Sequence, residues 1–150
     1  MTKIKICGLQ RIEDVEAVNK YLPDFIGFIL TPGFRRSISR ETAKKLKSAL
    51  SPKIKAVGVF VNDDAENINS FVQSGIIDMV QLHGSESNAY ISELRHHTGV
   101  GTIQAFQVRN EEDASRAEGS AADMVLLDNG QGTGAAFDWS YVSRMHRPFI

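Results

Sequence analysis

The chain has one cysteine, few prolines and almost no net charge, and these scarcities exclude several classes of protein. A single cysteine cannot form an internal disulfide, which excludes a disulfide-stabilised secreted domain. Seventeen basic and 18 acidic residues nearly cancel and are scattered, so no charged field attracts nucleic acid or an anionic membrane. The amino terminus carries neither an apolar signal core nor a stretch that could cross a bilayer. We therefore expect a cytoplasmic protein whose partner is a small molecule, with its oligomeric state left open.

Two nucleotide-binding signatures and a metal-binding pattern are also missing. Residues 7–11 read C-G-L-Q-R where a dinucleotide-binding fold has G-x-G-x-x-G, and no G-x-x-x-x-G-K-[ST] motif occurs. His96 and His97 are adjacent, face different ways on a predicted helix, and have no further ligand at metal-binding spacing. We expect these two histidines to be solvated and predict no metal site.

What the chain does contain is a regular alternation of strand and helix patterns. Short apolar or alternating runs predict six strands, at Lys3–Cys7, Phe25–Leu30, Ile54–Val61, Met79–His83, Thr102–Phe106 and Met124–Asp128. Amphipathic stretches predict five helices, at Ile12–Tyr21, Arg40–Leu50, Ala65–Ser74, Ser87–His97 and Glu111–Glu118. Ser39, Asp64 and Asn110 each offer a side-chain acceptor to a first helical turn.

Strict alternation of this kind predicts a parallel sheet, either a closed barrel or an open doubly wound sheet. The missing dinucleotide turn favours the α/β class of the (β/α)8 TIM-barrel family. Six βα units reach about Arg147, and Arg147–Ile150 is typical of the first residues of a seventh strand. We predict one domain over residues 1–150, an incomplete barrel of six units. Because a full barrel commonly needs about 200 residues or more, we expect a fragment or truncated product of a larger domain.

Polar side chains follow several predicted strands, at the ends where parallel α/β enzymes place their chemistry. The candidates are Cys7, Arg36, Asn62, Gln81, His83 and Asp128. Three of them also have a purely structural interpretation. Cys7 is also explained by burial as a small hydrophobe, Asn62 by a turn before a helix, and His83 by a hydrogen bond at a strand end. A carboxylate at Asp128 is costly to bury without a partner, which favours a functional role.

A glycine-rich segment, Gly130–Gly134, follows Asp128 directly. Such a loop either approaches a ligand closely with its backbone N–H groups or serves as a slack connector. Taken alone, the segment does not distinguish the two.

Five motifs occur in order along the chain at these strand ends. They are Lys5-Ile6-Cys7-Gly8; Ile26-Gly27-Phe28 with Pro32 and Arg36; Val57-Gly58-Val59-Phe60-Val61-Asn62; Val80-Gln81-Leu82-His83-Gly84; and Leu127-Asp128 with Gly132-Thr133-Gly134 and Phe137-Asp138-Trp139. Together they resemble the phosphoribosylanthranilate isomerase family of tryptophan biosynthesis, whose members are (β/α)8 barrels.

The resemblance implies an Amadori rearrangement of N-(5-phosphoribosyl)anthranilate to the 1-amino-1-deoxyribulose phosphate, without a cofactor. By motif match, Asp128 is the general acid that opens the ribose ring and Cys7 the general base that removes the C2 proton. Arg36 matches the position that pairs with the anthranilate carboxylate, and Gln81 and His83 are the further substrate-binding candidates. A free thiol titrates near about 8.5, so the base needs a cationic or hydrogen-bonding neighbour that the motifs do not identify.

The chain departs from the family pattern in two places. Phe34 stands where the family usually has a serine, two residues before Arg36. The loops after the seventh and eighth strands, which build the family's phosphate site, are not in the sequence. Two alternatives therefore stay open: a non-catalytic remnant that at most binds an anion weakly, and a redox-sensing thiol at Cys7 on a generic α/β domain.

Overall fold

The computed structural model describes residues 3–128, 139–143 and 145–150, and in this part of the chain it shows six parallel strands in one sheet. Their spatial order, β1-β2-β3-β4-β5-β6, is the order along the chain. The strands are β1 (Lys5–Cys7), β2 (Phe25–Ile29), β3 (Lys55–Phe60), β4 (Met79–Leu82), β5 (Gly101–Gln107) and β6 (Met124–Asp128). The helices are α1 (Ile12–Tyr21), α2 (Arg40–Ala49), α3 (Ala65–Gln73), α4 (Asn88–Thr98), α5 (Glu111–Glu118) and the short 3-10 helix η1 (Trp139–Val142).

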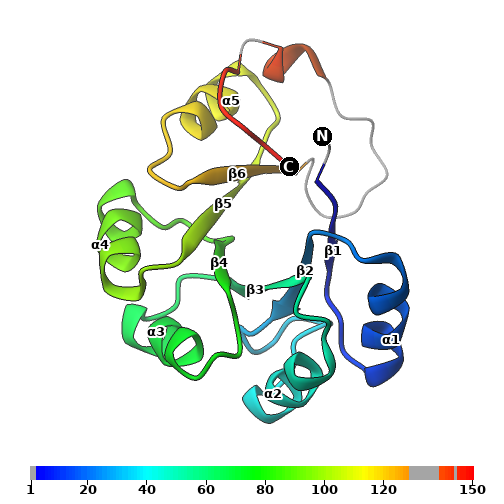
Figure 1. Cartoon of the computed structure of the whole chain (residues 1–150). Coiled ribbons are helices and arrows are strands. Elements are labelled where there is room, and N and C mark those ends of the chain that lie inside the picture. Colours follow the sequence, from blue (N-terminus) through cyan, green and yellow to red (C-terminus); the bar gives the residue numbers. More distant parts are fainter. Residues whose placement is uncertain (1–2, 129–138, 144) are drawn as a thin grey trace.

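The sheet is curved, and α1 to α5 lie along its outer side (Figure 1). Of the three apolar clusters in the described residues, two cover the two faces of the sheet. The larger joins strand residues such as Phe28 and Leu82 to helix residues such as Leu46 and Leu94, and so packs the helices onto the sheet. The second cluster contains no helix residue, and its members lie on the inner face of the sheet: Phe25, Val57, Met79 and Ile103, with Met124 and Leu126 against them. Strand order and the outer layer of helices confirm the (β/α) barrel architecture and exclude the open doubly wound alternative.

Helix caps form where the sequence predicts them. The side chain of Ser39 accepts a hydrogen bond from the backbone N–H of Thr42, Asp64 from that of Glu66, and Asn110 from that of Asp113. These bonds satisfy N–H groups that have no partner inside the helix.

Element boundaries differ from the predictions by at most two residues, and two of the differences have a local cause. The first strand begins at Lys5 because the N–H of Ile4 donates to the Asp24 carboxylate, at 2.8 Å, instead of joining the ladder. Ser87 is the cap of α4 and not its first residue, because its hydroxyl accepts from the N–H of Tyr90 at 3.2 Å.

The last residues of the chain run beside β6. Phe149 forms a parallel bridge with Val125, the N–H of Ile150 donates to the Val125 carbonyl at 2.9 Å, and the N–H of Leu127 donates to the Ile150 carbonyl at 2.9 Å. This confirms the prediction that a seventh strand begins there. No helix in the described segments is both long and apolar enough to cross a membrane.

Candidate active site

Cys7 lies at the carboxyl end of β1 and faces the inner side of the sheet. It pairs in register with Gly27, which pairs with Val57 of the inner cluster. The chain turns sharply at Gly8, whose φ of +85° favours glycine. The N–H groups of Gly8 and Leu9 both donate to the Gly27 carbonyl, at 2.8 and 3.2 Å. The turn fixes the half-buried Cys7 at the rim of the sheet.

Arg36 comes from the loop after β2 and reaches across to the end of β1. Its Nη1 donates to the Cys7 carbonyl oxygen at 2.8 Å. The loop is anchored by the N–H of Ile38, which donates to the Ile29 carbonyl at 2.9 Å. Gly8 leaves the space for the guanidinium, because a Cβ on Gly8 would lie 2.6 Å from Arg36 Nη1. The structure thus brings Arg36 and Cys7, predicted from separate motifs, into direct contact.

Gln81 lies in the interior of the sheet and is almost fully buried, with 2% of its surface exposed. It follows Met79 at strand spacing and pairs with Ile103, both members of the inner cluster, so it faces the same side as Cys7. Among the described residues, its Oε1 has no hydrogen-bond partner. Leaving a buried acceptor unpaired costs about 1–3 kcal/mol, so this carbonyl is a candidate acceptor in the site.

His83 and Asp128 occupy the same edge of the sheet. His83 follows β4 directly, and its side chain is exposed while its N–H donates to the Phe60 carbonyl at 2.8 Å. Asp128 ends β6, where it pairs with Gln107. It follows Leu126 at strand spacing, and Leu126 packs on the inner cluster, so the half-buried Asp128 faces inward.

Asn62 has a structural role at this edge. Its φ is +48°, and its Oδ1 accepts from the N–H of Ser85 at 2.8 Å. The Glu86 carboxylate accepts from the N–H groups of Asn62 and Gly84, at 2.8 and 2.9 Å. These bonds tie the loop after β3 to the loop after β4, which supports the turn interpretation of Asn62. Gly130–Gly134 and the pair Phe137 and Asp138 lie outside the described residues.

Comparison with known proteins identifies the family. The sequence profile described as N-(5'phosphoribosyl)anthranilate (PRA) isomerase matches residues 4–149. The chain belongs to this family. It is 42% identical over 150 residues to N-(5'-phosphoribosyl)anthranilate isomerase of Lacticaseibacillus casei (strain BL23), covering all of this chain and 72% of that protein. The corresponding enzyme of Endomicrobium trichonymphae is 39% identical over 155 residues, with 100% and 76% covered.

A solved structure agrees with the sequence comparison. A phosphoribosyl anthranilate isomerase in complex with reduced 1-(o-carboxyphenylamino)-1-deoxyribulose 5-phosphate superimposes with a TM-score of 0.80 at 32% identity. The superposition covers 95% of this chain and 69% of that chain. These comparisons confirm the family, the expected architecture of an incomplete (β/α)8 TIM barrel, and the isomerase function in tryptophan biosynthesis.

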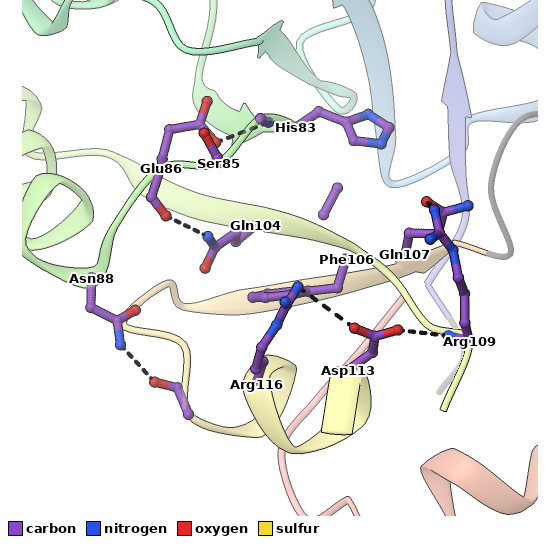
Figure 2. Close-up of a pocket in the computed structure, with 13 residues that line it drawn as sticks. His83, Ser85, Glu86, Asn88, Gln104, Phe106, Gln107, Arg109, Asp113 and Arg116 are labelled. Carbon is purple, nitrogen blue, oxygen red and sulfur yellow. Dashed lines mark hydrogen bonds and ion pairs between the residues drawn. The ribbon is translucent and has the colours of Figure 1, made fainter. Parts of the chain in front are cut away.

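A pocket of about 830 Å³ lies away from most of the predicted isomerase residues. It opens between β5, α5 and the loop after β4, and His83 alone of the five predicted residues lines it (Figure 2). Its charged side chains are partly paired with one another. Asp113 Oδ1 lies 3.7 Å from Arg116 Nη2, and Asp113 Oδ2 accepts a hydrogen bond from the backbone N–H of Arg109 at 3.0 Å. We therefore place the candidate isomerase site on the inner edge of the sheet and not in this pocket.

The described residues contain no group of three or more His, Cys, Asp or Glu side chains that could hold a metal ion. His96 and His97 are both exposed on α4, as expected. The candidate site is therefore built from a thiol, a guanidinium, an amide, an imidazole and a carboxyl group. This set of groups can bind an anion and move protons.

Sequence reasoning missed Lys5 and Gly27. A Cβ on Gly27 would lie 2.6 Å from Cys7 Sγ and 3.2 Å from Lys5 Nζ, so both side chains lie over this glycine. The signal in the sequence was the Lys5-Ile6-Cys7 spacing, which puts the two polar side chains on one face of a strand.

Proposed function

We propose that this chain catalyses the isomerisation of N-(5'-phosphoribosyl)anthranilate with five residues of the candidate site. They are Cys7, Arg36, Gln81, His83 and Asp128. Asp128 protonates the ring oxygen of the ribose, and the ring opens to a Schiff base. Cys7, as the thiolate, then removes the proton from C2 to give the enolamine, which tautomerises to the aminoketose product. The acid gives up one proton and the base takes one, so the isomerisation needs no cofactor.

The observation that carries this proposal is the hydrogen bond from Arg36 Nη1 to the Cys7 carbonyl oxygen, at 2.8 Å. A guanidinium has five N–H donors in a planar fork, and this bond uses one of them. The other donors suit a carboxylate such as that of anthranilate. A carboxylate bound there lies beside the residue that acts as the base, which supports the assignment of both roles.

The positions of the remaining residues support the same site. Cys7 and Asp128 end the first and the sixth strand on the inner face, so the acid and the base approach a bound sugar from different strands. The Oε1 of Gln81, which has no partner in the described part of the chain, is suited to accept a hydrogen bond from a substrate O–H or N–H group. We assign the exposed His83 imidazole to a further polar contact with the substrate.

We also propose that residues 1–150 act as one domain and that the protein resides in the cytoplasm. A reducing compartment keeps a single catalytic thiol available. The partner of the site is a phosphorylated small molecule.

Turnover tests the proposal. Cys7→Ala and Asp128→Asn should each lower kcat by about 100-fold or more, because each removes one proton-transfer group. Both should keep the far-ultraviolet circular dichroism of the unmodified chain. Arg36→Ala should act mainly on KM. Ordinary turnover in either of the first two variants would contradict the assigned roles. An unmodified chain that binds the reduced product analogue weakly and forms no product would favour the remnant alternative.

A further inference from the structure

The inner face of β1 carries a cation next to the proposed base. Lys5 and Cys7 are two residues apart on this strand, so their side chains lie on the same face. Both reach over Gly27 of the neighbouring strand, where a Cβ would lie 2.6 Å from Cys7 Sγ and 3.2 Å from Lys5 Nζ. Two atoms this close to one point are at most about 6 Å apart, within the range over which one charge stabilises an opposite charge.

The ammonium group of Lys5 forms no ion pair with any acidic side chain in the described part of the chain. The Lys5 side chain is half-buried. Other charged groups of the described residues also lie near Cys7, and Asp128 faces the same side of the sheet from the end of β6. Arg36 donates to the Cys7 carbonyl, and on α1 Arg11 pairs with Asp14 at 3.4 Å. The ammonium group of Lys5 is therefore the cation that lies over Gly27 together with the sulfur.

We propose that Lys5 is a positioning residue of the isomerase reaction, which favours the thiolate form of Cys7, and that Gly27 keeps the space in which the two groups meet. When the thiolate takes the C2 proton it becomes a neutral thiol, and Lys5 stays protonated throughout. The inference rests on the proposed role of Cys7 as the base. Lys5 is the cationic neighbour that this role requires.

Because the chain has a single cysteine, alkylation by iodoacetamide reports on Cys7 alone and requires no turnover. At neutral pH, Lys5→Met should slow alkylation by about threefold for a water-screened pair, and by more if water is excluded. Lys5→Arg should restore most of the rate. Lys3→Met is the matched control: Lys3 lies on the same segment, 5.7 Å from the Phe25 ring centre, and its removal should leave the rate unchanged.

Alkylation at high pH separates charge from access. Above the titration range of thiols, Cys7 is a thiolate in every variant, so Lys5→Met and the unmodified chain should react at equal rates. Equal rates already at neutral pH would overturn the proposal. So would a Lys5→Met variant that is equally slow at both pH values, since that result means altered access.

Gly27→Ala tests the role of the space. The added methyl group must displace Cys7 Sγ, so alkylation at neutral pH should slow and kcat should fall with little change in KM. Gly58→Ala is the control, because its Cβ meets only core side chains, at 2.8 Å from both Ile77 and Phe60. It should lose stability without slowing alkylation. Unaltered alkylation in Gly27→Ala would contradict the role of Gly27. Loss of turnover in Cys7→Ala tests the base assignment separately.

Discussion

At the scale of single residues, the candidate site depends on two glycines, because a larger residue at either position would collide with a functional group. Gly8 and Gly27 each lie where a methyl group would collide with a functional group, the Arg36 guanidinium in one case and Cys7 Sγ in the other. Gly8 also has a φ of +85°, which a side chain would strain. The collision with Arg36 and the backbone strain can be separated by comparison with a glycine that has a positive φ but no close neighbour.

Gly8→Ala should weaken binding of the reduced product analogue by about tenfold or more, because it displaces a charged bidentate donor. Gly99 is the matched control: its φ is +69°, and a Cβ there meets nothing within 4 Å. Both variants should lose about 1 kcal/mol or more of stability from backbone strain. Titration calorimetry should show the loss of affinity in Gly8→Ala alone. Equal affinities in the two variants would mean that Gly8 does not position Arg36.

At the scale of the elements, a hydrogen bond from the Tyr90 side chain connects α4 to the turn before α3. The Tyr90 hydroxyl donates to the Asp63 carbonyl at 2.7 Å, and burial raises the pKa of Tyr90 to about 12. The neutral phenol is therefore favoured in the folded state over the unfolded state. Its contribution to stability is fully present below the ordinary tyrosine value of 10 and is lost as the pH rises through about 12.

Tyr90→Phe should lower the free energy of unfolding by about 1 kcal/mol at pH 8, the usual value of one hydrogen bond. The difference between the two proteins should shrink when urea unfolding is repeated between pH 10 and 12. Spectroscopic titration should show one phenol that ionises near pH 12, and the Tyr90→Phe variant should lack this transition. A stability difference that does not change over this pH range would contradict the claim that the neutral Tyr90 phenol stabilises the fold.

Local sequence patterns predicted β1 to β6 and α1 to α5, but not η1. Each of the predicted elements carries its own periodicity, and each of the caps Ser39, Asp64 and Asn110 acts within three residues. Local patterns could not predict the contacts between loops. The Glu86 carboxylate joins the ends of β3 and β4 through residues 24 positions apart, and no local pattern encodes that pairing.

At the scale of the whole molecule, strand order and register bring the candidate site residues to one edge of the sheet. Strand-end positions predicted that Cys7, Arg36, Gln81, His83 and Asp128 share one edge, since parallel strands end on the same side. The meeting of Lys5 and Cys7 over Gly27 required the register of β1 against β2, which pairs Cys7 with Gly27. Register depends on the entire sheet, so the identity of the cation beside the thiol emerged only from the structure.

The central claim is that Cys7 and Arg36 face one bound substrate, and protection of Cys7 tests it most directly. Iodoacetamide alkylation should slow in proportion to site occupancy when reduced 1-(o-carboxyphenylamino)-1-deoxyribulose 5-phosphate is added. Arg36→Ala should need much more of this ligand for the same protection. An alkylation rate that stays constant while calorimetry shows the ligand bound would contradict the account.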